Sequence, residues 1–136
     1  MPASKDDIIA FMAAEFPQNK CVVEAVGNRR AIVAHDIGPG ELRPGGTVAG
    51  SVLMIVADIA LYVAILGEIG IVPLTVTTSL SFNFLRKPSA HARILGNARL
   101  IKVGRSLVVG EVSLYSENAS EPVAHAVGTY SIPPKR

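Results

Sequence analysis

The stretch VAGSVLMIVADIALYVAIL at residues 48–66 decides the fold, because nearly every residue in it is apolar. Its length is close to the ~20 residues that a membrane-spanning helix needs. Asp58 stands at its middle, however, where a charge costs on the order of 2.5–3.5 kcal/mol on insertion scales, and no basic cluster flanks the stretch. A helix that is apolar all round in a small chain is typically buried in a core. We therefore predict a buried central helix over residues 48–67 and no membrane insertion.

The chain after this helix alternates as strands do. Thr78, Leu80, Phe82 and Phe84 alternate with polar residues, which is typical of a half-buried strand. Three further strand-like runs follow: residues 92–103, 107–116 and 122–132. We predict that residues 73–132 form a four-stranded antiparallel meander. Since a sheet with one apolar face has to cover that face, the sheet is expected to curl around the central helix.

The chain before the central helix adds shorter elements. Residues 1–17 are predicted to carry a short amphipathic helix, with Ser4 as its N-cap and Pro17 at its end. Its apolar face has four members: Ile8, Phe11, Met12 and Phe16. Two strand-like runs then flank a Gly-Asn hairpin signal: residues 21–26 and 30–37. Residues 1–136 are thus expected to form one α+β domain.

Composition limits the class of protein. The chain has 136 residues, of which 49% are hydrophobic and 18% are charged, so it is long enough for one domain with a core. The charged share lies below the roughly 25% of an average domain, which we interpret as surface hidden by another subunit. The net charge of +2 is too small to indicate a nucleic-acid partner.

The metal-ligating residues are few and scattered. Cys21 is the single cysteine, which excludes an internal disulfide and a cysteine-ligated metal site and fits a reducing compartment. The three histidines lie far apart and are each interpreted as ordinary strand residues: His35, His91 and His125. The first residues do not have the pattern of a secretory signal. We expect no metal and a cytoplasmic location.

Asp58 is the first candidate for chemistry. Its neighbours on the helix surface cannot pair with a carboxylate as cations: they are Met54, Ile55, Leu61 and Tyr62. A buried carboxylate without a partner is costly, so Asp58 needs a reason. It is either a nucleophile or general base in a dry cleft, or a group that hydrogen-bonds a strand backbone or a partner subunit. Ser51 and Tyr62 lie on the same stripe of the helix.

The start of the helix is the second candidate. Gly45, Gly46 and Gly50 allow close approach of the backbone. The N-terminal amides of a helix have no intrahelical acceptor and can bind a developing oxyanion. The alternative is that these glycines only let the helix pack against the sheet.

A run of bases is the third candidate. Six bases occur with no acid between them: Arg86, Lys87, Arg93, Arg99, Lys102 and Arg105. A local basic patch suits a polyphosphate such as the one in coenzyme A. The alternative is that most of these bases lie on solvated strand faces and turns.

Several of these stretches resemble a known family. GTVAGS at residues 46–51 and VADIA at 56–60 resemble the helix entry of hotdog-fold thioesterases of the PaaI-like (phenylacetate-degradation) type. LSFNFLRKP at 80–88 resembles the next strand, and VGRS at 103–106 the turn after it. The resemblance implies a hotdog fold, in which an antiparallel sheet curls around one long helix. It also implies a homodimer or homotetramer with sites at the subunit interface.

The resemblance also implies roles for single residues. Asp58 falls on the catalytic carboxylate, which acts as nucleophile or general base. Gly50 falls on the residue whose backbone N–H polarises the thioester carbonyl. Thr77 falls on a hydroxyl that positions water, with Thr78 as the competing choice. Six residues are assigned to substrate binding: Arg43, Ser51, Tyr62, Arg86, Arg105 and Ser106.

The chain departs from this family at the helix entry. Ala49 stands where the family has a histidine, Ser51 replaces its second glycine, and Arg43 replaces an asparagine. The leading hypothesis is an acyl-CoA thioesterase that needs no cofactor beyond the coenzyme A of its substrate. A non-catalytic acyl-CoA or thioester binder is the alternative. A hydratase or dehydratase ranks lower, because these pair a histidine with a carboxylate and this helix and its entry loop contain none.

Overall fold

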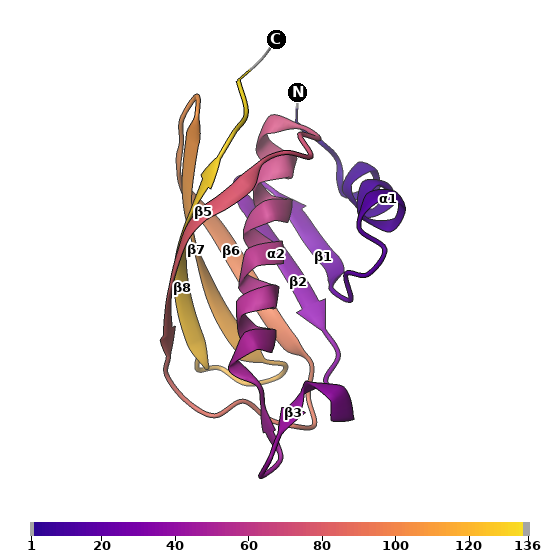
Figure 1. The fold of residues 1–136 in the computed structure, drawn as a ribbon, viewed down its shortest axis with the longest axis vertical. Helices are drawn as coiled ribbons and strands as arrows, with labels where there is room; N and C mark the ends of the chain where they lie inside the picture. The colour runs from indigo at the N-terminus through magenta and orange to yellow at the C-terminus, as the bar shows by residue number, and fades with distance from the viewer. Residues whose placement is uncertain (1, 135–136) are drawn as a thin grey trace.

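A six-stranded antiparallel sheet curls around one long helix in the computed structural model, which describes residues 2–134 (Figure 1). The elements in chain order are α1 (Lys5–Glu15), β1 (Val22–Gly27), β2 (Arg30–His35), the short 3-10 helix η1 (Pro39–Glu41), β3 (Leu42–Arg43), β4 (Thr47–Val48), α2 (Gly50–Ile69), β5 (Val76–Phe84), β6 (Ile94–Val103), β7 (Leu107–Ser116) and β8 (Ala124–Ser131). The predicted α+β class and the curled sheet are confirmed.

Helix α2 is the core of the molecule. Eleven of its residues are buried, and it is the one helix in the described part of the chain that is long and apolar enough to cross a membrane. Here the sheet covers it instead. The helix begins and ends two residues later than predicted. At its start, Thr47 and Val48 pair with Arg43 and Leu42 in the β3–β4 ribbon, and at its end the C-cap is Gly70.

The sheet is not the four-stranded meander that we predicted. Its strand order is β1-β2-β6-β7-β8-β5. Of the four predicted strands only β6, β7 and β8 follow one another as neighbours, whereas β5 pairs with β8, and β2 pairs with β6. Residues 85–93 are too many for a hairpin turn, and they carry the chain across the end of the sheet before β6 begins (Figure 1).

The N-terminal elements cover the β1 side of the helix. Ser4 caps α1 as predicted, and Asp7 completes a capping box. The buried residues of α1 are Ile8 and Met12. The β1–β2 hairpin is also confirmed, with two residues of its turn, Asn28 and Arg29, at positive φ.

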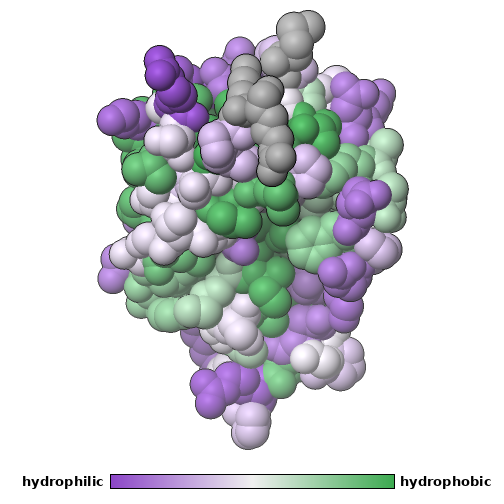
Figure 2. Space-filling view, turned by 45° about the horizontal axis from the view of Figure 1, so that its top comes forward, coloured by the Kyte–Doolittle hydropathy of each residue, from purple (hydrophilic) through white to green (hydrophobic). Residues whose placement is uncertain are grey.

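Strand β5 forms one edge of the sheet and remains largely uncovered. None of its nine residues is buried. Val76 and Phe84 on β5 are about half exposed, as are Met54 and Ile55 on α2. Hydrophobic side chains gather across the middle of the face in Figure 2. A long exposed edge strand of this kind is a template for pairing with another chain.

Candidate active site

Two strand hydroxyls hold the carboxylate of Asp58. Thr77 Oγ1 on β5 donates to Asp58 Oδ1 at 2.6 Å, and the phenol of Tyr130 on β8 donates to the same oxygen. The Tyr130 hydroxyl also lies 2.8 Å from the backbone carbonyl oxygen of Asp58. No cation forms an ion pair with Asp58 within residues 2–134. The half-buried carboxylate is therefore oriented by neutral donors.

A β-bulge turns Thr77 toward the helix. The β5–β8 register shifts between Thr77, which lies opposite Tyr130, and Ser79, which lies opposite Thr129. Thr78 is the extra residue, and its hydroxyl donates to the carbonyl of Thr129 at 3.2 Å. Without the bulge, strict alternation would place Thr78, and not Thr77, on the same side of the strand as Leu80 and thus facing the helix. Of the two threonines considered from sequence, the structure brings Thr77 to Asp58.

Tyr130 is a site residue that the sequence analysis missed. Its side chain is only 1% exposed. Burial and the adjacent negative charge of Asp58 raise its pKa well above the usual tyrosine range. The phenol therefore keeps its proton and remains a hydrogen-bond donor. The sequence contains a signal for it, because Tyr130 alternates with Ala126 and Gly128 and so belongs to the buried face of the strand. A buried tyrosine hydroxyl generally needs a polar partner.

A pocket of about 370 Å³ opens beside Asp58. Helix α1 supplies Phe11 and Glu15 to its wall, together with the C-cap Phe16, and α2 and β5 add Tyr62 and Val76. The Phe11 and Tyr62 rings lie 6.4 Å apart, centroid to centroid. The sequence analysis assigned no residue of α1 to a site, so its place in this wall was not predicted.

The predicted polar stripe of α2 divides in the structure. Tyr62 lines the Asp58 pocket and donates its hydroxyl to the Pro73 carbonyl at 3.1 Å, and partial burial raises its pKa. Ser51 is exposed on the first turn and does not line this pocket. Of the two other stripe residues, Tyr62 therefore shares a pocket with Asp58 and Ser51 does not.

Gly50 lies at a second pocket, at the N-terminus of α2. It is the first helical residue, so its N–H has no intrahelical acceptor. A Cβ at this position would come within 3.2 Å of the Phe84 ring, so the glycine allows β5 to approach the helix closely. The pocket has a volume of about 330 Å³, and Arg43, Arg86 and Lys87 contribute to its lining.

One chain does not bring Gly50 and Asp58 together. They are eight residues apart on α2, which corresponds to about 12 Å along the helix axis. They also line different pockets. The carboxylate and the candidate oxyanion donor are thus parts of a site that a single protomer leaves divided.

The six bases do not form one patch, because neighbouring elements supply acids that the local sequence lacks. Arg93 pairs with Glu117 and Glu24, and Arg99 pairs with Glu111 across neighbouring strands. Arg86 pairs with Glu121 and donates to the Pro122 carbonyl at 2.6 Å.

The β6–β7 turn carries the remaining predicted contacts. Arg105 and Ser106 are exposed there, and the Ser106 carbonyl accepts the Ile132 N–H at 2.8 Å. Since Ile132 lies two residues beyond Tyr130, this turn lies at the same end of the sheet as the Thr77–Tyr130 pair.

Histidine and metal chemistry find little support near Asp58. None of the three histidines lines its pocket, and residues 2–134 contain no group of three or more ligating side chains arranged for a metal ion. His35 and His125 lie on strands, whereas His91 lies in the β5–β6 connection rather than on a strand.

Comparisons with known proteins place this architecture in a family. The thioesterase superfamily model matches residues 45–123. A candidate thioesterase from Silicibacter sp. TM1040 is 39% identical, with 96% of this chain and 92% of that chain covered and a TM-score of 0.88. A mutant of the phenylacetic acid degradation protein PaaI from Thermus thermophilus is 25% identical, with 91% and 99% covered and a TM-score of 0.74.

A more distant structure shares the fold with a ligand present. A Streptococcus mutans protein bound to acetyl-CoA is 21% identical, with 87% of this chain and 92% of that chain covered and a TM-score of 0.72. No curated protein matches the chain significantly. The family model and the 39% identical structure together show that this chain belongs to the thioesterase superfamily, with a hotdog fold similar to that of the PaaI protein.

Proposed function

We propose that the protein is an acyl-CoA thioesterase that hydrolyses a thioester to a free acid and CoA. The observation that carries this proposal is the Asp58 carboxylate, which faces a pocket in a thioesterase-superfamily fold and is oriented by Thr77 and Tyr130. A carboxylate held by neutral donors keeps its negative charge available for chemistry.

Asp58 serves the reaction in one of two ways. As a general base it takes a proton from water, whose oxygen attacks the thioester carbon. The C–S bond then breaks, and the protonated Asp58 returns this proton to the sulfur, so that CoA leaves as the thiol. As a nucleophile, its carboxylate oxygen attacks the thioester carbon, the C–S bond breaks, and CoA leaves as a thiolate that takes a proton from water. Water then hydrolyses the resulting mixed anhydride, which releases the free acid and restores the Asp58 carboxylate. Thr77 donates to Oδ1 of this carboxylate, so it is well placed to orient the carboxylate or the water in both routes.

Gly50 is proposed to supply the oxyanion donor from a second subunit. Its N–H is unpaired within α2, and its distance from Asp58 along the helix calls for a partner. In an antiparallel pairing of two α2 helices that centres on Met54, Gly50 of one protomer lies opposite Asp58 of the other. Met54 and Ile55 at that centre are exposed and apolar.

The uncovered β5 edge supports the same assembly. Two β5 edges that pair antiparallel around a two-fold axis extend the sheet and run their α2 helices in opposite directions. This pairing covers the exposed side chains of Val76 and Phe84. We propose a homodimer as the smallest active unit, and a homotetramer as two such dimers.

Coenzyme A is proposed to lie along the exposed bases of this assembly. Arg43 and Arg86 line the pocket at Gly50 and suit a carbonyl or phosphate oxygen. Arg105 and Ser106 offer a base and a hydroxyl at the opposite end of β5. Ser51, exposed on the first turn of α2, and Tyr62, in the Asp58 pocket, complete the proposed substrate contacts.

Release of CoA thiol tests the function. Wild type and Asp58→Asn are compared on short, medium, long and aromatic acyl-CoAs. We expect wild type to turn over at least one class and Asp58→Asn to lose at least about 10²-fold in kcat, the low end of what a positioned acid or base contributes. Unchanged hydrolysis by Asp58→Asn would rule out the proposed role of this residue.

The alternative function is non-catalytic binding of acyl-CoA. Ala49 favours it, because α2 has no side-chain cap there and the residue that precedes Gly50 offers no polar side chain. Tight binding of acyl-CoAs without release of thiol above background across the whole panel would support the binder over the enzyme.

A further inference from the structure

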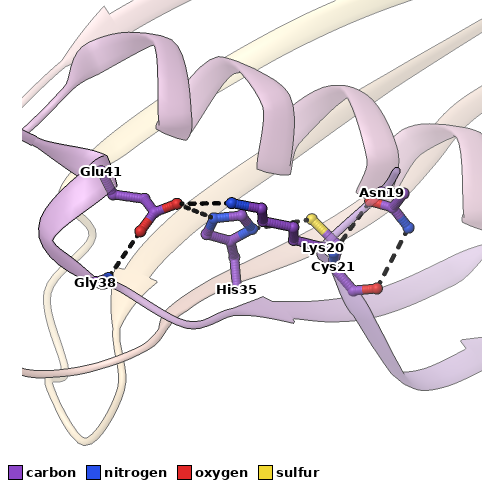
Figure 3. A network of polar contacts seen from close by, with 6 residues as sticks. All are labelled: Asn19, Lys20, Cys21, His35, Gly38 and Glu41. Carbon is purple, nitrogen blue, oxygen red and sulfur yellow. Dashed lines mark hydrogen bonds and ion pairs between the residues drawn. The ribbon is translucent and has the colours of Figure 1, made fainter. Parts of the chain in front are cut away.

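Glu41 joins the segment before α2 to the sheet. It is the last residue of η1, and its side chain is 14% exposed. Its Oε1 accepts the Gly38 N–H at 2.8 Å, and its Oε2 lies 3.7 Å from His35 Nε2 and 3.6 Å from Lys20 Nζ (Figure 3). One carboxylate thus ties the η1 turn to the end of β2 and to the chain that enters β1.

The backbone of Glu41 reaches the start of α2. Its carbonyl accepts the N–H of Ala49 at 2.9 Å, and Ala49 is the N-cap of α2. The Ala49 carbonyl in turn accepts the Val52 N–H at 3.0 Å. Glu41 therefore holds the residue that directly precedes Gly50.

Core packing of Val52 and Leu53 holds this end of the helix, but few polar contacts fix its first residues. Ala49 provides no side-chain cap, and the β3–β4 ribbon consists of two residue pairs. Gly45 and Gly46 in the turn of this ribbon both have positive φ, which few other residues adopt. The contacts of Glu41 thus form a polar link between the N-terminus of α2 and the sheet.

The groups around the Glu41 carboxylate form a continuous series. His35 is 6% exposed, and its Nδ1 lies 3.7 Å from Cys21 Sγ. Asn19 accepts the Cys21 N–H at 3.0 Å and donates to the Cys21 carbonyl at 3.3 Å. The Gly38 N–H above all, with Lys20 and His35 adding to it, lowers the pKa of Glu41. The carboxylate is therefore ionised at neutral pH.

We propose that Glu41 is a positioning residue that holds the Gly50 N–H where it polarises the thioester carbonyl. Its carbonyl fixes Ala49, and its carboxylate fixes its own turn against Gly38, His35 and Lys20. This role rests on the proposed function of Gly50. Glu41 acts through the backbone of the helix entry and makes no contact with substrate.

The kinetic test compares Glu41→Ala, Glu41→Gln and the control Glu111→Ala. Like Glu41 with His35 and Lys20, Glu111 contacts a histidine and a base, His125 and Arg99, but it lies on β7. We expect Glu41→Ala to lower kcat by about tenfold or more, less than the ~10²–10³ of a deleted oxyanion donor, with KM within about threefold. Glu41→Gln keeps an acceptor for Gly38 and is expected to restore kcat to within about threefold of wild type. Glu111→Ala is expected to leave kcat unchanged.

Amide hydrogen exchange measured by NMR tests the same role without substrate. In Glu41→Ala, the amides of Ala49 and Val52 are expected to exchange at least about tenfold faster, while those in the middle of α2 do not change. Unchanged exchange at Ala49 and Val52 would overturn the proposal. Three kinetic results would also overturn it, provided that wild type is active. They are an unchanged kcat in Glu41→Ala, a kcat of Glu41→Gln as low as that of Glu41→Ala, and an equal loss of kcat in Glu111→Ala.

The two proposals fail in different ways. If wild type releases no CoA from any acyl-CoA, the thioesterase proposal fails, and the Gly50 role of Glu41 fails with it. If wild type is active and the Glu41 variants keep the wild-type kcat, as the Glu111→Ala control does, the thioesterase proposal stands. The positioning role of Glu41 is then overturned.

Discussion

Asp58 is oriented by hydroxyl groups that reach it from two adjacent strands. Thr77 and Tyr130 lie directly opposite each other in the β5–β8 pairing, so the sheet register brings both to one carboxylate oxygen. Neutral donors stabilise a carboxylate without cancelling its charge, which suits a group that must accept a proton or attack carbon.

Thr77→Val is predicted to lower kcat by about 10²-fold, because it removes a donor from the reacting carboxylate. Thr78→Val is the matched control, since its hydroxyl bonds only the Thr129 carbonyl among the described residues. We expect less than about a threefold change in kcat for the control, where only one ordinary hydrogen bond is lost. Initial rates of CoA release measure both, and equal effects of the two variants would contradict the bulge-based assignment.

Tyr130 gives a prediction about stability at high pH. Its pKa is raised in the folded protein, so the unfolded chain loses this proton first, from about pH 10. The contribution of Tyr130 to stability is therefore complete below about pH 10 and falls above it, by about 1.4 kcal/mol per pH unit.

Urea unfolding of wild type and Tyr130→Phe at several pH values measures this contribution. We expect wild type to be more stable at pH 8 by about 1.5–3 kcal/mol, the range for a hydrogen bond to a charged group. The difference is expected to shrink between about pH 10 and pH 12, because phenylalanine does not titrate. A difference that stays constant over this range would contradict the raised pKa.

Sequence reasoning found part of this site. Asp58 stood out because a charge inside an apolar helix needs a physical reason, and Thr77 entered through family resemblance with Thr78 as its rival. The choice between the two threonines depends on a bulge, which period-two alternation does not predict. Tyr130 is 72 residues from Asp58 in sequence, so their contact depends on the strand order.

At the level of elements, the close approach of α2 to the sheet depends on glycines in β7 and β8. A Cβ on Gly110 would come within 2.6 Å of the Leu61 side chain, and one on Gly128 within 2.7 Å of it. The two glycines lie opposite each other in the β7–β8 register. Because neither residue has a side chain, Leu61 can pack directly against the sheet backbone at this point. This contact sets the distance between the sheet and α2, which carries Asp58.

Gly110→Ala is predicted to lower the free energy of unfolding by about 1–3 kcal/mol, the usual cost of overpacking a core. Gly40→Ala is the control, because a Cβ there meets nothing within 4 Å, and we expect a change within about 0.5 kcal/mol. Chemical denaturation monitored by circular dichroism measures both. A Gly110→Ala protein as stable as wild type would contradict the tight packing of Leu61.

The elements themselves were largely predictable, and their order in the sheet was not. The Ser4 cap, the hairpin at residues 27–30 and strand β7 follow from local sequence chemistry. The position of β5 beside β8 follows from how the whole sheet closes around α2, which no local pattern encodes. The acid partners of Arg93 and Arg99 were missed for the same reason, because they lie on neighbouring elements.

For the whole molecule, the exposed face of α2 and the β5 edge argue that one chain is an incomplete unit. Gly50 and Asp58 line separate pockets, and the apolar residues midway between them, Met54 and Ile55, are uncovered. A two-fold partner explains both observations, because it covers the apolar surface and joins the two halves of the site.

Ile55→Glu is predicted to shift the protein toward monomer and to lower CoA release at least about tenfold, because it places a charge in the proposed interface. Ile101→Glu is the control: Ile101 on β6 is 50% exposed, against 52% for Ile55. Sedimentation velocity and the thiol assay measure both. A wild type that is monomeric at micromolar concentration would contradict the assembly.

Subunit complementation tests the central claim most directly. Gly50→Pro removes the N–H at the first position of α2, and the first position of a helix tolerates proline. Ala49 already has the extended backbone (φ −64°, ψ 138°) that a residue before proline adopts. Gly50→Ala keeps the N–H and controls for the added Cβ. Homodimers of Gly50→Pro and of Asp58→Asn are each expected to be inactive.

A purified heterodimer of one Gly50→Pro and one Asp58→Asn subunit contains one intact and one doubly altered site. Because the two sites of a two-fold dimer are equivalent, we predict about half of the wild-type kcat per dimer. A heterodimer as inactive as either parent would contradict a site that joins Asp58 of one subunit to Gly50 of the other.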